Sequence, residues 1–420
     1  MMMKKISLRF KTRETALKPQ NRPPKTYLRF VWFVPLVLII FLSSCAKNKN
    51  EDGQSKYEGS LSAMNAKLFS IEYMADGVKL VSDSEGNELL LVPREAAVPV
   101  AYRDKKVVRT PIQRAFFMST THVGLLLALE NEHVLDSIAA VMSAEDDWTI
   151  QPIIERFKRG QIQYIPWTMQ TSVNIEAVAA LKPDMVFSSS GYESSTKLFP
   201  KLDELGMSYM EVSEFLEESN EAGLEWIKFF AAFYNLDEEA GAIYEKKCER
   251  LRTLSRMTSE IPEDKKPLVA FANVFQGNVT VQGGEATTAK ELEKAGGRYF
   301  LEKLPGNVNV RISMEEFFSK AKDADILMYN AMINWMPDKK ALAEEVPLIS
   351  EFKSFKNNKI YVQSKGYFMN SAALDVKFED VVSIFHPELL PDRELTFYTV
   401  LPDSALGTEP VDTNGGGGAE

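Results

Sequence analysis

Cysteine and histidine are both scarce in this chain. Its 420 residues include two cysteines, Cys45 and Cys248, and three histidines, His122, His133 and His386. The histidines are scattered, and no H-x-H, H-E-x-x-H or C-x-x-C spacing groups candidate metal ligands. The sequence therefore predicts no protein-ligated metal site, and an enzyme built around a metal cluster would lack its ligands.

Motifs typical of catalysis are also missing. The chain has no G-x-S-x-G, no P-loop and no G-x-G-x-x-G after an expected strand. Gly283-Gly284 precedes an expected helix and leaves a phosphate cradle open as a minor alternative to an ordinary turn. Gly296-Gly297 fits the end of that helix. We expect a protein that is not an enzyme and carries no cofactor of its own.

Positive charge is rare outside the N-terminus. Residues 1–44 hold nine Lys or Arg and one acid, Glu14, so the formal charge of −10 for the whole chain becomes −18 without them. Binding to nucleic acid needs clustered Lys and Arg. An acidic body of this kind argues against nucleic acid as a partner.

The N-terminus reads as a targeting segment. The apolar run Phe30–Leu42 has 13 residues and would span about 20 Å, less than a bilayer core of about 30 Å. A basic region followed by a short apolar run is typical of a signal peptide. The end, Leu42-Ser43-Ser44-Cys45, resembles a bacterial lipobox, which implies lipidation of Cys45 and anchoring to a membrane of the cell envelope. The alternative is a buried Cys45 in an N-terminal membrane helix.

The rest of the chain divides by composition and pattern. We expect a signal peptide at 1–44, a polar tether at 45–64, an N-terminal α/β lobe with a leading hairpin at 65–235, an interlobe helix at 236–260, and a C-terminal α/β lobe at 261–401. The acidic, Gly-rich residues 402–420 are expected to be disordered.

Alternating patterns predict the fold class. Short apolar runs such as "RAFFMS", "DMVFSSS", "PLVAFANV" and "DILMYNA" alternate with helix-period segments such as "IEAVAALK" and "MEEFFSKAKD". Such alternation predicts βαβ units, and hence an α/β fold of two Rossmann-like lobes with mainly parallel sheets.

One long helix is expected between the lobes. Residues 237–257 contain no proline and carry acids at the start and bases at the end. Their apolar residues, which include Tyr244, Cys248 and Leu251, recur about every 3.6 residues, as in a helix. Asp237 is a candidate N-cap. We expect Cys248 to be a small core residue.

A phrase recurs about 140 residues apart, as "VNIEAVAALKPDMVFSSS" at 173–190 and "ISMEEFFSKAKDADILMYN" at 312–330. In each copy a polar residue (Asn174 or Ser172, then Ser313) precedes a helix that carries a glutamate early in its first turn. A glutamate at this position can have a purely structural role, because its negative charge stabilises the positive N-terminal end of the helix dipole and can cap the first turn.

The chain resembles the periplasmic substrate-binding proteins that serve ABC importers of iron complexes, siderophores and vitamin B12. The resemblance rests on "NIEAVAALKPDMVF", "KLFPKLDELGMSYMEV", "GLEWIKFFAAFYN", "ELEKAGGRYF", "ISMEEFFSKAKDADILMYN" and "DVVSIFHPELLPD", in that order, from about Phe69 to Tyr398. It implies two lobes bridged by one backbone helix, and one exposed glutamate on each lobe that pairs with permease arginines. The residues of this chain that match the motif are Glu176 and Glu315. Glu316 is adjacent to Glu315 and is an alternative for the second position.

Ligands of open α/β sheets bind beyond the carboxyl ends of the strands. Aromatic and polar residues at or near those ends suit a large, partly apolar ligand, although each aromatic is also a candidate core residue. The candidate cleft residues are Thr120, His122, Trp148, Trp167, Ser190, Tyr192, Phe275, Tyr329, Trp335 and Tyr367.

These observations predict a monomeric, lipid-anchored binding protein that captures a ferric siderophore between two lobes and delivers it to a permease dimer. Cobalamin, another corrinoid or haem are alternative ligands for the same fold. A surface lipoprotein that binds glycans or host proteins is the alternative from another class. Because a packed helix resists bending, we expect only a small hinge closure on binding.

Overall fold

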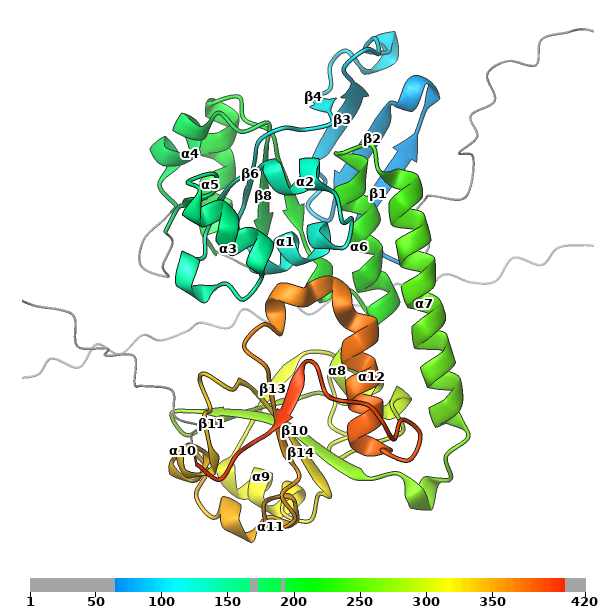
Figure 1. Ribbon diagram of the computed structural model, residues 1–420, viewed down its shortest axis with the longest axis vertical. Helices are drawn as coiled ribbons and strands as arrows, with labels where there is room; N and C mark the ends of the chain where they lie inside the picture. The colour runs from blue at the N-terminus through cyan, green and yellow to red at the C-terminus, as the bar shows by residue number, and fades with distance from the viewer. Residues whose placement is uncertain (1–64, 167–172, 190–192, 405–420) are drawn as a thin grey trace, which may run out of the picture. The chain divides into compact units, whose positions relative to one another are not determined.

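The computed structural model describes residues 65–166, 173–189 and 193–404 (Figure 1). This part of the chain forms two α/β lobes, one with a parallel sheet and one with a mixed sheet whose centre is parallel, joined by one long helix. The predicted fold class is therefore confirmed. Within the described ranges, no helix combines the length and the apolar character that crossing a membrane requires.

The first lobe is built on a parallel sheet with the strand order β7-β6-β5-β8-β9. The central strand comes first in the chain, so the chain winds outward in both directions, as in other doubly wound sheets. The strands are β5 (Ala115–Phe117), β6 (Ile138–Val141), β7 (Gln163–Tyr164), β8 (Met185–Ser189) and β9 (Tyr209–Val212). The helices are α1 (Thr120–Leu127), α2 (Glu132–Asp136), α3 (Gln151–Lys158), α4 (Ile175–Leu181) and α5 (Glu193–Glu204).

A second, smaller sheet precedes this lobe in the chain. Its strands β1 (Phe69–Tyr73), β2 (Lys79–Asp83) and β3 (Glu88–Pro93) are antiparallel, as the hairpin signals predicted. Strand β4 (Val107–Thr110) adds to β3 in the parallel sense, which the sequence did not suggest.

Helix α6 (Asn220–Ala232) lies inside the first lobe, and eleven of its residues are buried. Ser219 caps it by accepting a hydrogen bond from the Ala222 amide at 3.1 Å. The aromatic side chains of α6 explain why it is buried on every face. The rings of Phe69 and Trp226 meet edge to face at 4.8 Å, and Trp226 donates from its indole nitrogen to Glu217 at 3.0 Å.

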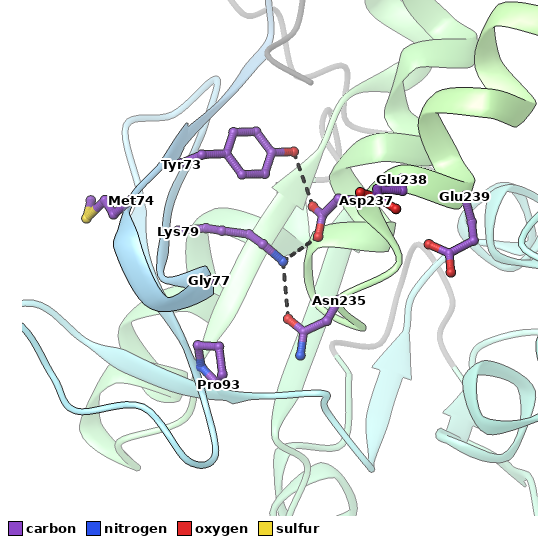
Figure 2. Close-up of a pocket in the computed structure, with 9 residues that line it drawn as sticks. All are labelled: Tyr73, Met74, Gly77, Lys79, Pro93, Asn235, Asp237, Glu238 and Glu239. Carbon is purple, nitrogen blue, oxygen red and sulfur yellow. Dashed lines mark hydrogen bonds and ion pairs between the residues drawn. The ribbon is translucent and has the colours of Figure 1, made fainter. Parts of the chain in front are cut away.

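The long helix α7 (Asp237–Ser259) has 23 residues and joins the lobes. Its buried residues include Tyr244, Cys248 and Leu251, at the predicted spacing. The expectation that Asp237 caps the helix was wrong. Asp237 is the first helical residue, and its carboxylate instead pairs with the ammonium of Lys79 on β2 at 2.6 Å (Figure 2).

The second lobe has a mixed sheet with the strand order β13-β11-β10-β14-β15-β16, and β12 also pairs with β10. Its centre, β10-β14-β15, is parallel. The strands are β10 (Leu268–Phe275), β11 (Asn278–Gln282), β12 (Arg298–Tyr299), β13 (Asn309–Ile312), β14 (Ile326–Met332), β15 (Ile360–Gln363) and β16 (Tyr398–Val400). The helices are α8 (Thr287–Lys294), α9 (Met314–Ala321), α10 (Lys339–Glu345), α11 (Lys353–Lys356) and α12 (Leu374–Phe385).

Short 3₁₀ segments connect these elements. They are η1 (Ala75–Gly77), η2 (Val100–Tyr102), η3 (Glu145–Asp147), η4 (Glu214–Leu216), η5 (Glu263–Lys265), η6 (Ile349–Glu351) and η7 (Phe368–Ala373).

The two lobes also touch directly, where α1 of the first lobe packs on η7 of the second. Gly124 makes this approach possible, because a Cβ at this position would lie 2.3 Å from the Met369 carbonyl oxygen and 2.6 Å from Ser371 Oγ. The Ser371 hydroxyl donates to the carbonyl of Thr121. Helix α12 runs beside α7 (Figure 1), and Lys247 on α7 pairs with Asp375 on α12 at 3.1 Å.

Candidate functional site

A cavity of about 420 Å³ lies between the lobes, here called the interlobe cavity. All of its walls follow the carboxyl ends of parallel strands, which is where open α/β sheets bind ligands. From the first lobe it is lined by Ser119, Thr120, Thr121, Ser143 and Asp147, after β5 and β6. From the second lobe it is lined by Met332, Asn334, Trp335, Lys365, Phe368 and Met369, at the ends of β14 and β15 and in η7.

Two exposed aromatic residues connect this cavity to its neighbours. Trp335 is 67% exposed and also lines a pocket of about 840 Å³ at the ends of β10 and β14, here called the C-lobe pocket. Phe368 is 42% exposed and also lines a pocket of about 450 Å³ next to α8 and α12, here called the lysine pocket because Lys377 lines it. Large apolar side chains left open to solvent beside a cavity are typical of a binding site.

The charged groups of the interlobe cavity come from opposite lobes. Asp147 belongs to the first lobe, and its carboxylate accepts a hydrogen bond from the amide of Ala144 at 3.1 Å. Lys365 belongs to the second lobe, and its ammonium lies 3.4 Å from the carbonyl oxygen of Asp146. The cavity thus offers hydroxyl groups, one acid, one base and two aromatic faces, which suits binding of a molecule with both polar and apolar parts.

Glu214 in η4 lies beside this cavity and was missed by the sequence analysis. Its carboxyl accepts a hydrogen bond from the hydroxyl of Thr121, and its other oxygen is buried without a partner among the described residues. Burial raises the pKa of Glu214 to about 7. No motif surrounds this residue, so only its place in the fold reveals it.

The predicted cleft residues have different locations. Thr120 lines the interlobe cavity, Phe275, Tyr329 and Trp335 line the C-lobe pocket, and Tyr367 lines the lysine pocket. Trp167, Ser190 and Tyr192 lie outside the described residues, as does the lipidation candidate Cys45.

Two predicted cleft residues belong to the interior instead. His122 is fully buried, its ring centre lies 6.0 Å from that of Phe230, and neither ring nitrogen has a hydrogen-bond partner in the described chain. Burial lowers the pKa of His122 to about 3. Trp148 is 3% exposed and donates to the carbonyl of Ser143 at 3.4 Å. Both follow strand ends, but the first turn of α1 and the loop after η3 direct them away from the cavity.

The two glutamates of the repeated phrase occupy equivalent positions. Glu176 is the second residue of α4 and Glu315 the second residue of α9, and both are exposed. Asn174 caps α4 by accepting from the Ala177 amide at 2.9 Å, and Ser313 caps α9 by accepting from the Glu316 amide at 3.1 Å.

Glu315 also interacts with the end of its own helix. Hydrogen bonds from its own backbone amide and from Ser313 lower the pKa of Glu315. The helix start keeps this carboxylate charged, and its exposure leaves it accessible to a cationic partner.

Protein ligands for a bare metal ion are not grouped in the described chain: it contains no cluster of three or more His, Cys, Asp or Glu that could hold one. What the cavities offer is shape, aromatic faces and a few polar groups. Such a lining suits the binding of a ligand that has both polar and apolar parts.

Comparison with known proteins agrees with this geometry. The chain belongs to the family of periplasmic binding proteins, because residues 118–365 match the model of that family. A relative described as an uncharacterized lipoprotein of Methanocaldococcus jannaschii is 28% identical over 329 residues, which cover 76% of this chain and 77% of that protein.

Solved structures share the fold at low identity. A periplasmic solute binding protein from Veillonella parvula has a TM-score of 0.54 and 17% identity, covering 76% of this chain and 89% of its own. CeuE of Helicobacter pylori has a TM-score of 0.53 and 18% identity, covering 75% and 90%. The periplasmic haem binding protein HutB of Vibrio cholerae has a TM-score of 0.52 and 14% identity, covering 66% and 99%.

Proposed function

We propose that this protein is a lipid-anchored solute-binding protein that captures a metal chelate of the ferric siderophore type between its lobes and delivers it to an ABC importer. The observation that carries the proposal is the interlobe cavity, which is lined from both lobes by the residues that follow parallel strands. The metal is part of the cargo, so the protein needs no cofactor and does no chemistry.

Several features support a chelate as the cargo. Trp335 and Phe368 present exposed aromatic faces, and the C-lobe pocket extends the space available beyond Trp335. A large ligand with an apolar periphery would bury these faces on binding. Haem and corrinoids have similar properties, and the haem binding named for HutB makes them the second candidates.

Lipid anchoring rests on Cys45 within Leu42-Ser43-Ser44-Cys45, and on relatives that are described as lipoproteins. The anchor would hold a monomer at the cell envelope, with residues 45–64 as a tether. Delivery then requires docking on a permease dimer. Exposed carboxylates at the same position of α4 and α9, one on each lobe, are suited to two charge-assisted pairs with permease arginines.

The direct test is a thermal-shift screen of ferric siderophores, haem and cobalamin. A true ligand at 100 times its dissociation constant should stabilise the protein by about 2.7 kcal/mol. Replacing Trp335 with Ala should weaken that ligand by about tenfold or more, since an aromatic anchor is removed. Tyr164 is a matched control, because it is exposed on β7 and does not line any of the three pockets.

The proposal fails if none of the three classes of compound stabilises the protein, or if the Trp335 and Tyr164 variants bind equally well. Stabilisation by oligosaccharides alone would instead support the alternative of a glycan-binding surface lipoprotein.

A further inference from the structure

The lysine pocket contains a charge whose surroundings the transport function does not explain. Lys377 is the fourth residue of α12, is 6% exposed and lines this pocket of about 450 Å³. Its ammonium lies 4.3 Å from the centre of the Tyr367 ring and 5.5 Å from that of Phe397. Among the described residues it has no carboxylate partner and no hydrogen bond. An ammonium buried with rings as its only partners is costly, unless a ligand supplies the missing anion.

Two acids close to Lys377 along α12 are already engaged. Asp380, one turn further along α12, is fully buried, pairs with Arg393, and accepts hydrogen bonds from the amides of Thr396 at 2.8 Å and Phe397 at 2.6 Å. Asp375 pairs with Lys247 of α7 at 3.1 Å. Neither is left over to neutralise Lys377.

Glu291 is the other charged side chain that lines the lysine pocket. It pairs with Lys294 at 2.8 Å and accepts a hydrogen bond from the side chain of Asn220 at 2.7 Å. A doubly charged anion such as phosphate would be repelled by Glu291, and Lys377 alone would neutralise only one of its charges. A singly charged anion matches Lys377 alone.

The remaining walls define the rest of the ligand. Phe271, Leu374, Phe378 and Val381 form an apolar part of the wall, and Phe215 lines the pocket from the first lobe with a ring that is 58% exposed. Amide and hydroxyl side chains also line the pocket, from Asn220, Gln282, Thr287, Thr288, Asn309, Asn330 and Gln363. A ligand that fits has one negative charge at one end and an apolar body at the other. Burial lowers the pKa of Lys377 to about 7, and the negative charge of a bound anion would raise this pKa again because it stabilises the ammonium.

We propose that the lysine pocket binds a small monocarboxylate with an apolar body, with the carboxylate on Lys377 and the body against Phe271 and Phe378. The carboxylate can be a free acid or an arm of a larger ligand in the interlobe cavity, since both spaces share Phe368. The inference rests on the lysine pocket itself and does not require that the interlobe cavity binds a chelate.

The test uses benzoate as the probe and benzamide as its neutral counterpart, with binding to the full chain measured by calorimetry. We expect benzoate to bind and benzamide and inorganic phosphate to bind at least about tenfold more weakly. Lys377→Met keeps a long apolar side chain under the rings and should weaken benzoate by a similar factor. Lys320→Met is the control, since Lys320 on α9 is exposed and lines none of the three pockets.

A spectroscopic readout separates binding at Lys377 from binding elsewhere. NMR of lysine labelled at Cε should show the pKa of Lys377 rising when benzoate is added. Equal binding of benzoate and benzamide, unchanged affinity in Lys377→Met, or an unchanged pKa of Lys377 would each overturn the proposal. If benzoate competes with a chelate found in the thermal-shift screen, the carboxylate belongs to an arm of the larger ligand. If both bind at the same time, the lysine pocket binds a separate free acid.

Discussion

The ammonium of Lys79 and the carboxylate of Asp237 lie 2.6 Å apart and tie the N-terminal sheet to the first residue of α7. Both side chains are almost fully buried, and each has a further partner. Lys79 donates to the side-chain oxygen of Asn235 at 3.2 Å, and Tyr73 donates to Asp237 at 3.2 Å (Figure 2). Lys79 also donates to the carbonyl of Ala232 at 3.0 Å. The pair also lines a pocket of about 360 Å³. Burial lowers the pKa of Lys79, and the Asp237 charge opposes that shift.

Removing one member of this pair should be more harmful than removing both. Asp237→Ala would leave Lys79 charged and buried, and we expect it to lower the free energy of unfolding by about 3–5 kcal/mol. The double variant Lys79→Met, Asp237→Leu should lose much less. Urea unfolding of the three proteins measures this, and a double variant that is less stable than Asp237→Ala would contradict it.

Gly124 should resist even the smallest side chain. In Gly124→Ala the new Cβ meets the backbone of Met369 and the hydroxyl of Ser371, so α1 and η7 must separate, at a cost of about 1–3 kcal/mol. Gly223→Ala in α6 is the matched control, because its Cβ would meet the flexible end of Leu374 at 3.2 Å and would lie at an ordinary contact distance of 3.6 Å from the carbonyl oxygen of Glu214. Thermal unfolding should show a loss for the first variant and a change of less than about 1 kcal/mol for the second.

His122 should make the fold sensitive to acid. Its pKa is about 3 when folded and about 6.5 when unfolded, so the unfolded chain binds the proton first as the pH falls. Because of His122, the free energy of unfolding falls as the pH drops below about 6.5. The expected loss between pH 7 and pH 5 is about 2 kcal/mol. His122→Leu should lack this loss, whereas a variant of the exposed His133 should keep it. Denaturation curves at pH 7 and pH 5 measure this loss. If the wild type and His122→Leu lose the same free energy of unfolding, His122 is not the cause.

The proposed docking role of Glu176 and Glu315 is tested by separating uptake from ligand affinity. Glu176→Ala and Glu315→Ala should each reduce uptake through the permease and should reduce it most in combination, because two charge-assisted pairs are lost. The affinity for the ligand should stay unchanged. Glu316→Ala is the matched control, since Glu316 is also exposed in the first turn of α9. Normal uptake in the double variant, or a loss of ligand affinity, would show that these residues have another role.

Ligand binding should move the lobes only slightly. Helix α7 is continuous over 23 residues, and α1 packs on η7 with no room for a Cβ at Gly124. Crystal structures or scattering curves with and without ligand should therefore superpose closely. A rotation of tens of degrees between them would falsify this expectation.

Much of the fold could be predicted from local pattern. The runs that became β5, β8, β10 and β14 are short, apolar and bounded by turn residues, and α7 shows its period over more than five turns. Helices α6 and α12 were harder, because both are buried on nearly every face and so lack a clear amphipathic period. The parallel pairing of β4 with β3 depends on a long-range contact that local sequence does not encode.

The site was less predictable than the fold. Strand ends could be located, but the direction of a side chain in the following turn could not, which is why Thr120 lines the interlobe cavity while His122, two residues later, is buried. Lys377 was missed because a lysine in a helix is ordinarily exposed. The single base among the apolar and acidic residues of "LDVKFEDVV" was the available signal.

The close packing of α1 on η7 at Gly124 has a consequence for how transport would be regulated. If the lobes hardly move, an empty copy shows the permease nearly the same surface as a loaded one, including both glutamates. Empty protein then acts as a competitive inhibitor of delivery. The rate of uptake would follow the ratio of loaded to empty copies at the membrane, so that making more of the protein without more ligand would slow import.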